Sequence, residues 1–179
     1  SCLDLCGRER EAGLEFDLRC PAELAIVSDR LLWRHVLMNL IGNAVKFTMH
    51  KDLRDHLSPP RVVVRIDRDD VNPEMLRVEV SDNGPGIDLV DQAFIFGKFS
   101  QAGTHGFRAP QGLSSGIGLH LSVTIVQMLH GKLDLLSPVG ADGRGTRFGF
   151  VVPCTFVQKK EQSDSVLLRD HAPAPFNTS

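Results

Sequence analysis

The chain has 179 residues, of which 42% are hydrophobic and 23% charged, a composition typical of one globular domain with a substantial core. The formal net charge of −2 gives no electrostatic reason to expect a nucleic-acid partner. The sequence contains neither a long apolar run nor a secretory signal, so we expect no direct membrane insertion. The four cysteines lack CxxC spacing, which favours reduced thiols in a cytoplasmic protein over disulfides or a zinc site.

The N-terminal part of the chain is predicted to contain a helix end, a strand and one long helix. The chain opens without a methionine, so we expect a piece of a longer protein, with residues 1–13 as the end of a helical linker. Alternating apolar residues predict a strand over 14–19. A long helix is predicted over 30–47, with Ser28 or Asp29 as its N-cap.

The rest of the chain alternates between strand patterns, one loop and a second helix. Two strands are predicted around 62–66 and 76–80, joined as a hairpin. The segment 100–116 is rich in Gly, Ser and Gln and predicts a functional loop. The remaining predicted elements are a helix over 117–130 that ends with Gly131 at its C′ position, strands over 132–136 and 146–152, and a disordered C-terminal linker over 156–179.

Together these elements predict an α/β domain over 14–155. Its expected architecture is a two-layer α+β sandwich, with one mixed, mostly antiparallel sheet and helices packed on one face. The order of predicted helices and strands does not by itself indicate a function.

A polar stripe runs along the long helix, which is otherwise apolar and is expected to be buried. His35, Asn39, Asn43 and Lys46 follow one another at spacings of four, four and three residues, so they share one face. The stripe is either a solvated face or a core amide network, or else it is a ligand site. An Asn oxygen suits a hard cation such as Mg²⁺, and a lysine one turn later suits phosphate.

A turn sequence follows the strand that ends near residue 81. In Asp82-Asn83-Gly84-Pro85-Gly86 the glycines fit a tight turn, but they also allow the backbone to approach a flat ring closely. An aspartate at a strand end can accept a hydrogen bond from an exocyclic amine such as N6 of adenine.

Two further glycine-rich segments precede regular elements. Gly116-Ile117-Gly118-Leu119 opens the second helix, where free N–H groups favour phosphate. Gly143-Arg144-Gly145-Thr146 leads into the last strand and is also compatible with a plain hairpin turn. Neither a dinucleotide-binding fingerprint nor a P-loop is present.

Taken together and in this order, the segments resemble the ATP-binding catalytic domain of sensor histidine kinases. That family shares the GHKL superfamily, or Bergerat fold, with type II topoisomerases, heat-shock chaperones and mismatch-repair ATPases. NLIGNAVKFT is similar to its N box, DNGPGI, GIGLHLS and GRGTRFGF to its three glycine boxes, and IFGKFSQ to its phenylalanine box. The resemblance implies an α/β sandwich that holds nucleotide beneath a mobile ATP lid at residues 100–116.

The resemblance also implies roles for individual residues, with ATP and Mg²⁺ as cofactors. Asn43 would coordinate Mg²⁺ with support from Asn39, and Lys46 would contact phosphate. Asp82 would read the adenine amine. The other implied contacts are Gly84, Gly86, Ile87, Gly143, Gly145 and Thr146 around adenine, Gly116, Gly118 and Leu119 near the phosphates, and Phe96 and Phe99 at the base of the lid.

One helix position bears on the reaction. ATP-hydrolysing members of the superfamily carry a glutamate where this chain has Asn39, and an amide is no general base near neutral pH. We therefore expect phosphoryl transfer to a histidine on a separate helical dimerisation domain, with a response-regulator receiver domain as a further partner, in a sensor kinase or a hybrid kinase. The alternatives are a nucleotide-sensing module that has lost transfer and a chaperone- or topoisomerase-type ATPase switch.

Overall fold

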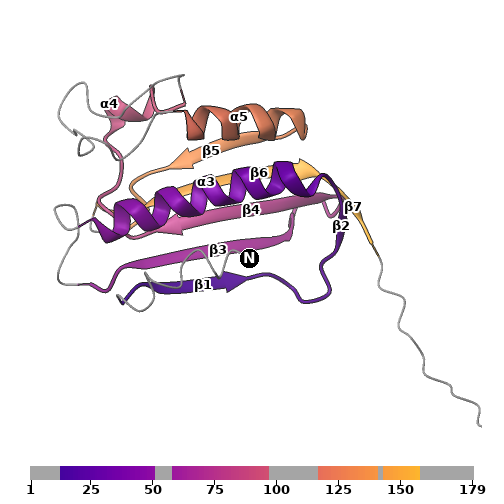
Figure 1. Cartoon of the computed structure of the whole chain (residues 1–179), viewed down its shortest axis with the longest axis horizontal. Helices are drawn as coiled ribbons and strands as arrows, with labels where there is room; N and C mark the ends of the chain where they lie inside the picture. Colours follow the sequence, from indigo (N-terminus) through magenta and orange to yellow (C-terminus); the bar gives the residue numbers. More distant parts are fainter. Residues whose placement is uncertain (1–12, 51–57, 97–116, 141–142, 158–179) are drawn as a thin grey trace, which may run out of the picture.

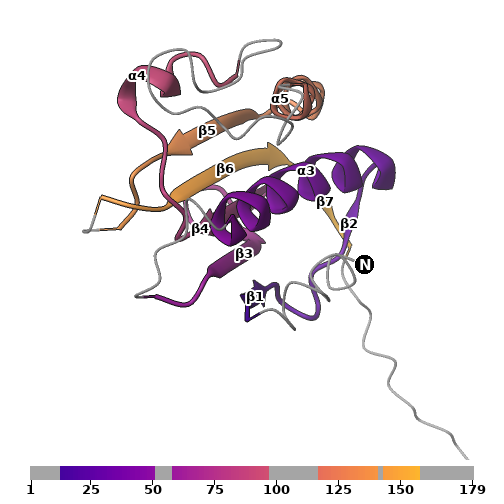
Figure 2. The ribbon, with the colours of Figure 1, turned by 60° about the vertical axis from the view of Figure 1, so that its left-hand side comes forward.

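The computed structural model describes residues 13–50, 58–96, 117–140 and 143–157. The helical linker predicted before Gly13, most of the predicted C-terminal linker and the whole predicted lid lie outside these residues. Two helices, α3 (Arg30–Met49) and α5 (Gly118–Met128), lie on the same side of a five-stranded sheet, with a short third helix α4 (Leu89–Gln92) nearby (Figures 1 and 2). The predicted two-layer α/β sandwich is confirmed.

The sheet has the strand order β1-β3-β4-β6-β5. Strand β1 runs parallel to β3, and every other neighbouring pair is antiparallel, as the prediction of a mixed, mostly antiparallel sheet requires. The bounds are β1 (Glu15–Arg19), β3 (Arg61–Arg68), β4 (Met75–Asp82), β5 (Lys132–Leu136) and β6 (Thr146–Pro153).

The core lies between the sheet and α3. Buried residues alternate with exposed or half-buried ones along the central strands β3, β4 and β6, because successive side chains of a strand point to opposite faces. Val62, Val78 and Phe150 contribute to the core from the sheet, and Val36 and Leu40 from the helix. The sheet's register therefore follows from the apolar alternation already visible in the sequence.

Helix α3, predicted as a buried helix with one polar stripe, is buried on one face and half-buried or exposed elsewhere. Its buried residues recur at the spacing of one helix face, and His35 is exposed. Asp29, one of the two predicted N-caps, accepts hydrogen bonds from the N–H groups of Leu31 and Leu32. Ser28 instead accepts a hydrogen bond from Trp33 Nε1, at 2.6 Å.

A two-stranded antiparallel ribbon that the strand patterns did not predict joins distant parts of the chain. It consists of β2 (Ile26–Val27) and β7 (Thr155–Phe156), with Ile26 paired to Phe156. Phe156 is the first residue of the predicted C-terminal linker, and the Arg68 guanidinium lies 3.7 Å from the centre of its ring. The last described strand thus ends at Phe156.

The end of α5 corrects one prediction. The left-handed residue after the helix is His130, with a φ of 62°, and not Gly131. The His130 N–H donates to Gln127 O and the Gly131 N–H to Val126 O, which is the Schellman pattern with His130 at C′. Gly131 is needed for a different reason, since a Cβ there would lie 2.6 Å from Val151 O.

Replacing His130 by glycine is expected to raise the free energy of unfolding by about 1 kcal/mol, because glycine adopts a left-handed conformation without steric cost. The His130 side chain is exposed, so little packing is lost. Urea denaturation of the wild type, His130→Gly and His130→Ala measures the effect. The alanine variant should be close to wild type, and equal stabilisation by both substitutions would contradict the backbone explanation.

Candidate functional site

The site is built at one edge of the sheet, where β4 ends and β6 begins. Asp82, the last residue of β4, is the register partner of Thr146, the first residue of β6. This pairing brings the first and third glycine boxes together. The Gly145 N–H donates a 2.8 Å hydrogen bond to Gly84 O, so the two turns are held at a fixed separation.

Asp82 is the central polar group of this edge. Its Oδ1 accepts a 2.8 Å hydrogen bond from the Gly84 N–H, which orients the carboxyl group. Burial raises the pKa of Asp82 to about 7, outweighing the opposite effect of the N–H groups of Gly84 and Thr146. Near neutral pH, a partner that donates a hydrogen bond will therefore favour the ionised carboxylate.

Ser137 and Gln92 fix the loop after Asp82. Ser137 Oγ donates to Gly145 O at 3.0 Å and accepts from the Ile87 N–H at 2.8 Å. Gln92 Nε2 donates to Ile87 O at 2.7 Å and to Ser137 O at 2.8 Å. Neither residue was identified from the sequence, because isolated Ser and Gln residues carry no spacing pattern that would have marked them.

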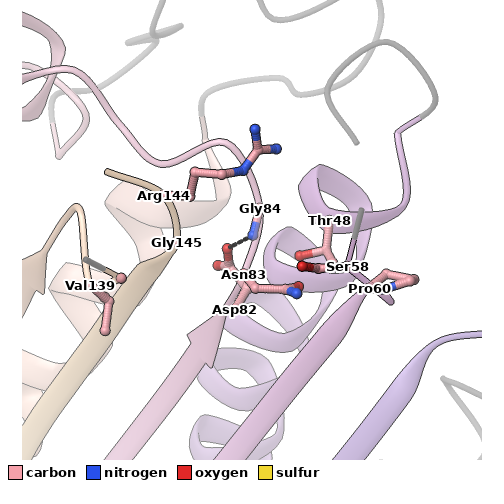
Figure 3. Close-up of a pocket in the computed structure, with 10 residues that line it drawn as sticks. Thr48, Ser58, Pro60, Asp82, Asn83, Gly84, Val139, Arg144 and Gly145 are labelled. Atoms are coloured by element: carbon pink, nitrogen blue, oxygen red, sulfur yellow. Dashed lines mark hydrogen bonds between the residues drawn. The ribbon is translucent and has the colours of Figure 1, made fainter. Parts of the chain in front are cut away.

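Two cavities meet at Asp82. One, of about 40 Å³, is lined by Asp82 together with Phe47, Gly86, Ile87, Asp91 and Thr146, among others. The other, of about 290 Å³, is bordered by Thr48, Ser58, Asn83 and Arg144, among others (Figure 3). We call them the inner slot and the outer cavity. The inner slot contains more of the residues predicted for adenine.

One residue of the polar stripe, Asn39, contacts α5. Asn39 Nδ2 donates a 2.8 Å hydrogen bond to Ser122 Oγ, and a Cβ on Gly118 would collide with Asn39 Oδ1. Gly118 is therefore required for the close approach of the two helices. Asn43 and Lys46 are half-buried, and burial lowers the pKa of the Lys46 ammonium group.

The C-terminal end of α3 lies close to Asp82. Both Asp82 Oδ1 and Thr48 Oγ1 lie within 3.4 Å of the position that a Cβ on Gly84 would take. Thr48 belongs to the buried face of α3, whereas Asn43, five residues earlier, is turned from it by about 140° around the helix axis. The contact therefore places the C-terminal end of α3 beside the sheet edge that carries Asp82.

The remaining predicted residues are placed only in part. The Phe96 ring packs edge-on against Phe148, with ring centres 6.4 Å apart, and Phe96 O lies 3.2 Å from His120 Nδ1. Leu119 is half-buried and packs against the core. Gly143 has a φ of 77° in the turn before β6. The predicted contacts Phe99 and Gly116 lie outside the described residues.

Residues 28–155 match the family model described as "Histidine kinase-, DNA gyrase B-, and HSP90-like ATPase". The chain belongs to this family, as the resemblance of its boxes implied. Within the family it carries the ATP-binding catalytic domain of the histidine kinases. No described helix is long and apolar enough to cross a membrane.

Curated relatives of the chain include sensor kinases. It is 32% identical over 167 residues to the autoinducer 2 sensor kinase/phosphatase LuxQ of Vibrio cholerae, covering 92% of this chain and 17% of the relative. It is 30% identical over 169 residues to the aerobic respiration control sensor protein ArcB of Escherichia coli, covering 93% and 19%. The chain thus spans less than a fifth of the length of these relatives.

Solved structures share the fold. The mycobacterial sensor histidine kinase MprB superposes with a TM-score of 0.64 at 24% identity, covering 84% of this chain and 90% of that one. The full-length ShkA structure, solved in complex with AMPPNP, gives a TM-score of 0.66 at 26% identity, covering 87% and 29%. The first likeness concerns the fold alone.

Proposed function

We propose that this domain binds MgATP and transfers the γ-phosphoryl group to a histidine on a separate helical dimerisation domain. The observation that carries the proposal is the half-buried Asp82 carboxyl group, placed between two paired turns and close to Thr48 at the end of α3. A carboxylate at this position can accept a hydrogen bond from the exocyclic amine of adenine. The AMPPNP complex of the related ShkA supports an adenine nucleotide as the ligand.

The residues fit the nucleotide in the following roles. Asp82 accepts a hydrogen bond from the adenine amine, and Lys46 contacts phosphate. The turns around adenine are formed by Gly84, Gly86, Ile87, Gly143, Gly145 and Thr146. Gly118 and Leu119 lie beside the phosphates at the start of α5, with Gly116 before them, and Phe96 and Phe99 anchor the base of the lid at residues 100–116.

Mg²⁺ is assigned to Asn43. No cluster of three or more His, Cys, Asp or Glu side chains forms a metal site among the described residues. The Asn43 oxygen suits this ion, because Mg²⁺ is usually held by one or two protein oxygens together with phosphate oxygens and water. When bound, the ion neutralises charge on the phosphates. Asn39 orients the α3–α5 contact beside it through Ser122.

In the proposed reaction the bond from the γ-phosphorus to its bridging oxygen breaks and leaves ADP. A bond from an imidazole nitrogen of the acceptor histidine to phosphorus forms. The domain contributes positioning and charge neutralisation. Asn39 cannot activate water as a general base, and its amide is already engaged with Ser122, so transfer is favoured over an ATPase switch.

The experiment mixes the purified chain with γ-labelled ATP, Mg²⁺ and a histidine-bearing dimerisation domain from a related kinase. Label is expected on the acceptor domain and only in the presence of this chain. ATP binding without label would instead support a nucleotide-sensing module that has lost transfer. Steady phosphate release by the chain alone, abolished by Asn43→Ala, would support the ATPase switch. In the full protein we expect a receiver domain as the next acceptor and a cytoplasmic location for this domain.

A further inference from the structure

Strand β5 is an edge of the sheet. Among the described residues it pairs with β6 on one side, and no other described backbone group forms a hydrogen bond with it. Alternate residues of a strand direct their N–H and C=O groups to its two sides, so β5 has unpaired backbone groups along its outer side. Figure 1 shows β5 at the border of the sheet, beside α5. An edge of this kind can be extended by a further strand.

A groove of about 460 Å³ lies between β5 and α5. Leu133 and Leu135 border it from the strand, and Val123 and Gln127 from the helix. We call it the edge groove. Of all its lining residues, Gln92 and Phe96 alone have a place in the nucleotide site described above. Since every second side chain of a strand points to the same face, a strand added to β5 would place alternate side chains in this groove.

The other face of β5 carries two opposite charges. Leu133 is buried in the core on the helix side of the sheet, so its neighbours Lys132 and Asp134 point to the face that the helices leave uncovered. These two side chains are 86% and 66% exposed and form an ion pair with each other at 2.9 Å. Both charges are therefore accessible to a strand that lies next to β5.

The order of these residues makes β5 complementary to itself. When two copies of β5 pair antiparallel about Leu133, Lys132 of each copy lies opposite Asp134 of the other copy. The two Leu133 side chains lie opposite each other on the helix side. Because opposite charges across a strand pair are favourable and like charges are unfavourable, this register is supported by two cross-strand ion pairs.

We propose that β5 is an interaction surface for a second copy of this chain, in which the two β5 strands pair antiparallel about a two-fold axis and join both sheets into one. In this arrangement Leu135 of one copy lies opposite Gly131 of the other, at the edge groove. The pairing needs no nucleotide and goes beyond the proposed function. It is short, because β5 has five residues, so we expect a weak dimer. The dimerisation domain proposed above would favour it by raising the local concentration.

Strand β1, at the other edge of the sheet, provides a comparison. Asp17 and Arg19 form an ion pair two residues apart on β1, so this strand has a similar charge pattern. No described helix lies beside β1 in Figures 1 and 2, whereas β5 has α5 and the edge groove. The groove is therefore the reason to place the second copy at β5.

Sedimentation equilibrium of the full chain in low-salt buffer, at concentrations up to about 1 mM, measures the association. We expect the wild type to dimerise. Lys132→Glu sets acidic side chains opposite each other in the pair, and Asp134→Lys sets basic ones opposite each other. Each substitution alone should weaken dimerisation about tenfold.

An equal mixture of the Lys132→Glu and Asp134→Lys variants should associate as tightly as the wild type. In the mixed dimer both acidic side chains of one copy face the basic side chains of the other. The ion pair within β5 is lost in both variants, and its loss predicts no recovery on mixing. Arg19→Glu and Asp17→Lys are the matched controls on β1 and should leave dimerisation unchanged.

Three results would overturn the proposal. A wild type that stays monomeric up to about 1 mM would show that β5 does not bind a second copy, and this result stands on its own if a variant does not fold. Variants that associate no better when mixed than alone would exclude the antiparallel register about Leu133. Loss of dimerisation in the β1 variants, with none in the β5 variants, would place the contact at the other edge. ATP binding is measured separately, so none of these results decides the proposed function.

Discussion

Replacing Asp82 by asparagine should weaken ATP binding about a hundredfold at pH 8, equivalent to about 2.7 kcal/mol. The Gly84 N–H already requires an acceptor at Oδ1. The amide side chain of the variant would therefore turn its NH₂ group toward the adenine amine, so that two donors would face each other. Calorimetric titration with a non-hydrolysable ATP analogue measures the loss.

The same substitution should stabilise the free protein at high pH. The folded-state pKa of Asp82 is about 7, above the ordinary value for an unfolded chain, so the folded protein binds this proton more tightly. The stability that the group contributes is present at low pH and is lost as pH rises through about 7. The asparagine side chain does not ionise, so the Asp82→Asn variant does not lose this stability as pH rises. Its free energy of unfolding should exceed that of the wild type by about 2 kcal/mol at pH 8 and by less at pH 5.

The ATP affinity of the wild type should rise with pH around 7 relative to that of the Asp82→Asn variant. The reason is that the ionised carboxylate accepts hydrogen bonds at both oxygens, whereas the protonated group carries an O–H donor. Asp70→Asn, an exposed aspartate in the β3–β4 turn, is the control for the change in net charge and should alter neither property. If Asp82→Asn binds ATP as the wild type does, the adenine assignment of Asp82 is wrong. If its stability has the pH dependence of the wild type, the buried carboxyl does not titrate near 7.

The sequence predicted those parts of the fold that depend on local alternation. Strands β3, β4 and β6 alternate buried apolar residues such as Val62, Val78 and Phe150 with exposed or half-buried ones. Because the apolar residues at every second position share one face, the sequence indicates which face of each strand is covered by helices. Asp82 and Thr146 were both identified as candidate binding residues. Their direct pairing required the strand order, which follows from no single segment.

The sequence did not predict features that depend on contacts between distant segments of the chain. The β2–β7 ribbon pairs residues far apart in the chain, as Ile26 with Phe156, and each strand has only two residues, too few for a period. Thr48 occupies the buried face of α3 at the spacing of Ala44 and Ile41. The Thr48 hydroxyl on this face could have indicated the outer cavity, but a single threonine among apolar residues of a helix does not by itself predict a cavity.

Replacing Gly145 by alanine should cost more than about 3 kcal/mol of unfolding free energy and abolish ATP binding. Gly145 has a φ of 83°, where alanine is strained by about 1–2 kcal/mol. A Cβ there would also lie 2.7 Å from the carbonyl oxygen of Asp82. Relief of this clash requires β6 to move away from β4, which would break the Gly145–Gly84 hydrogen bond and displace the Asp82 carboxyl group.

Gly143→Ala separates the backbone strain from the steric clash. Gly143 has nearly the same φ, 77°, but among the described residues, its chain neighbours apart, no atom lies within 4 Å of its Cβ position. It should cost about 1 kcal/mol, the backbone strain alone. Gly13 has a φ of 93°, is far from the site in sequence and has no atom of the other described residues within 4 Å of its Cβ position. Gly13→Ala should in addition leave ATP affinity unchanged. Equal destabilisation at positions 143 and 145 would mean that backbone strain dominates and that the close packing of the two turns contributes little to the position of Asp82. A larger cost at 145, with affinity lost in the folded fraction, would mean that the contact between the turns sets the geometry of the carboxyl group.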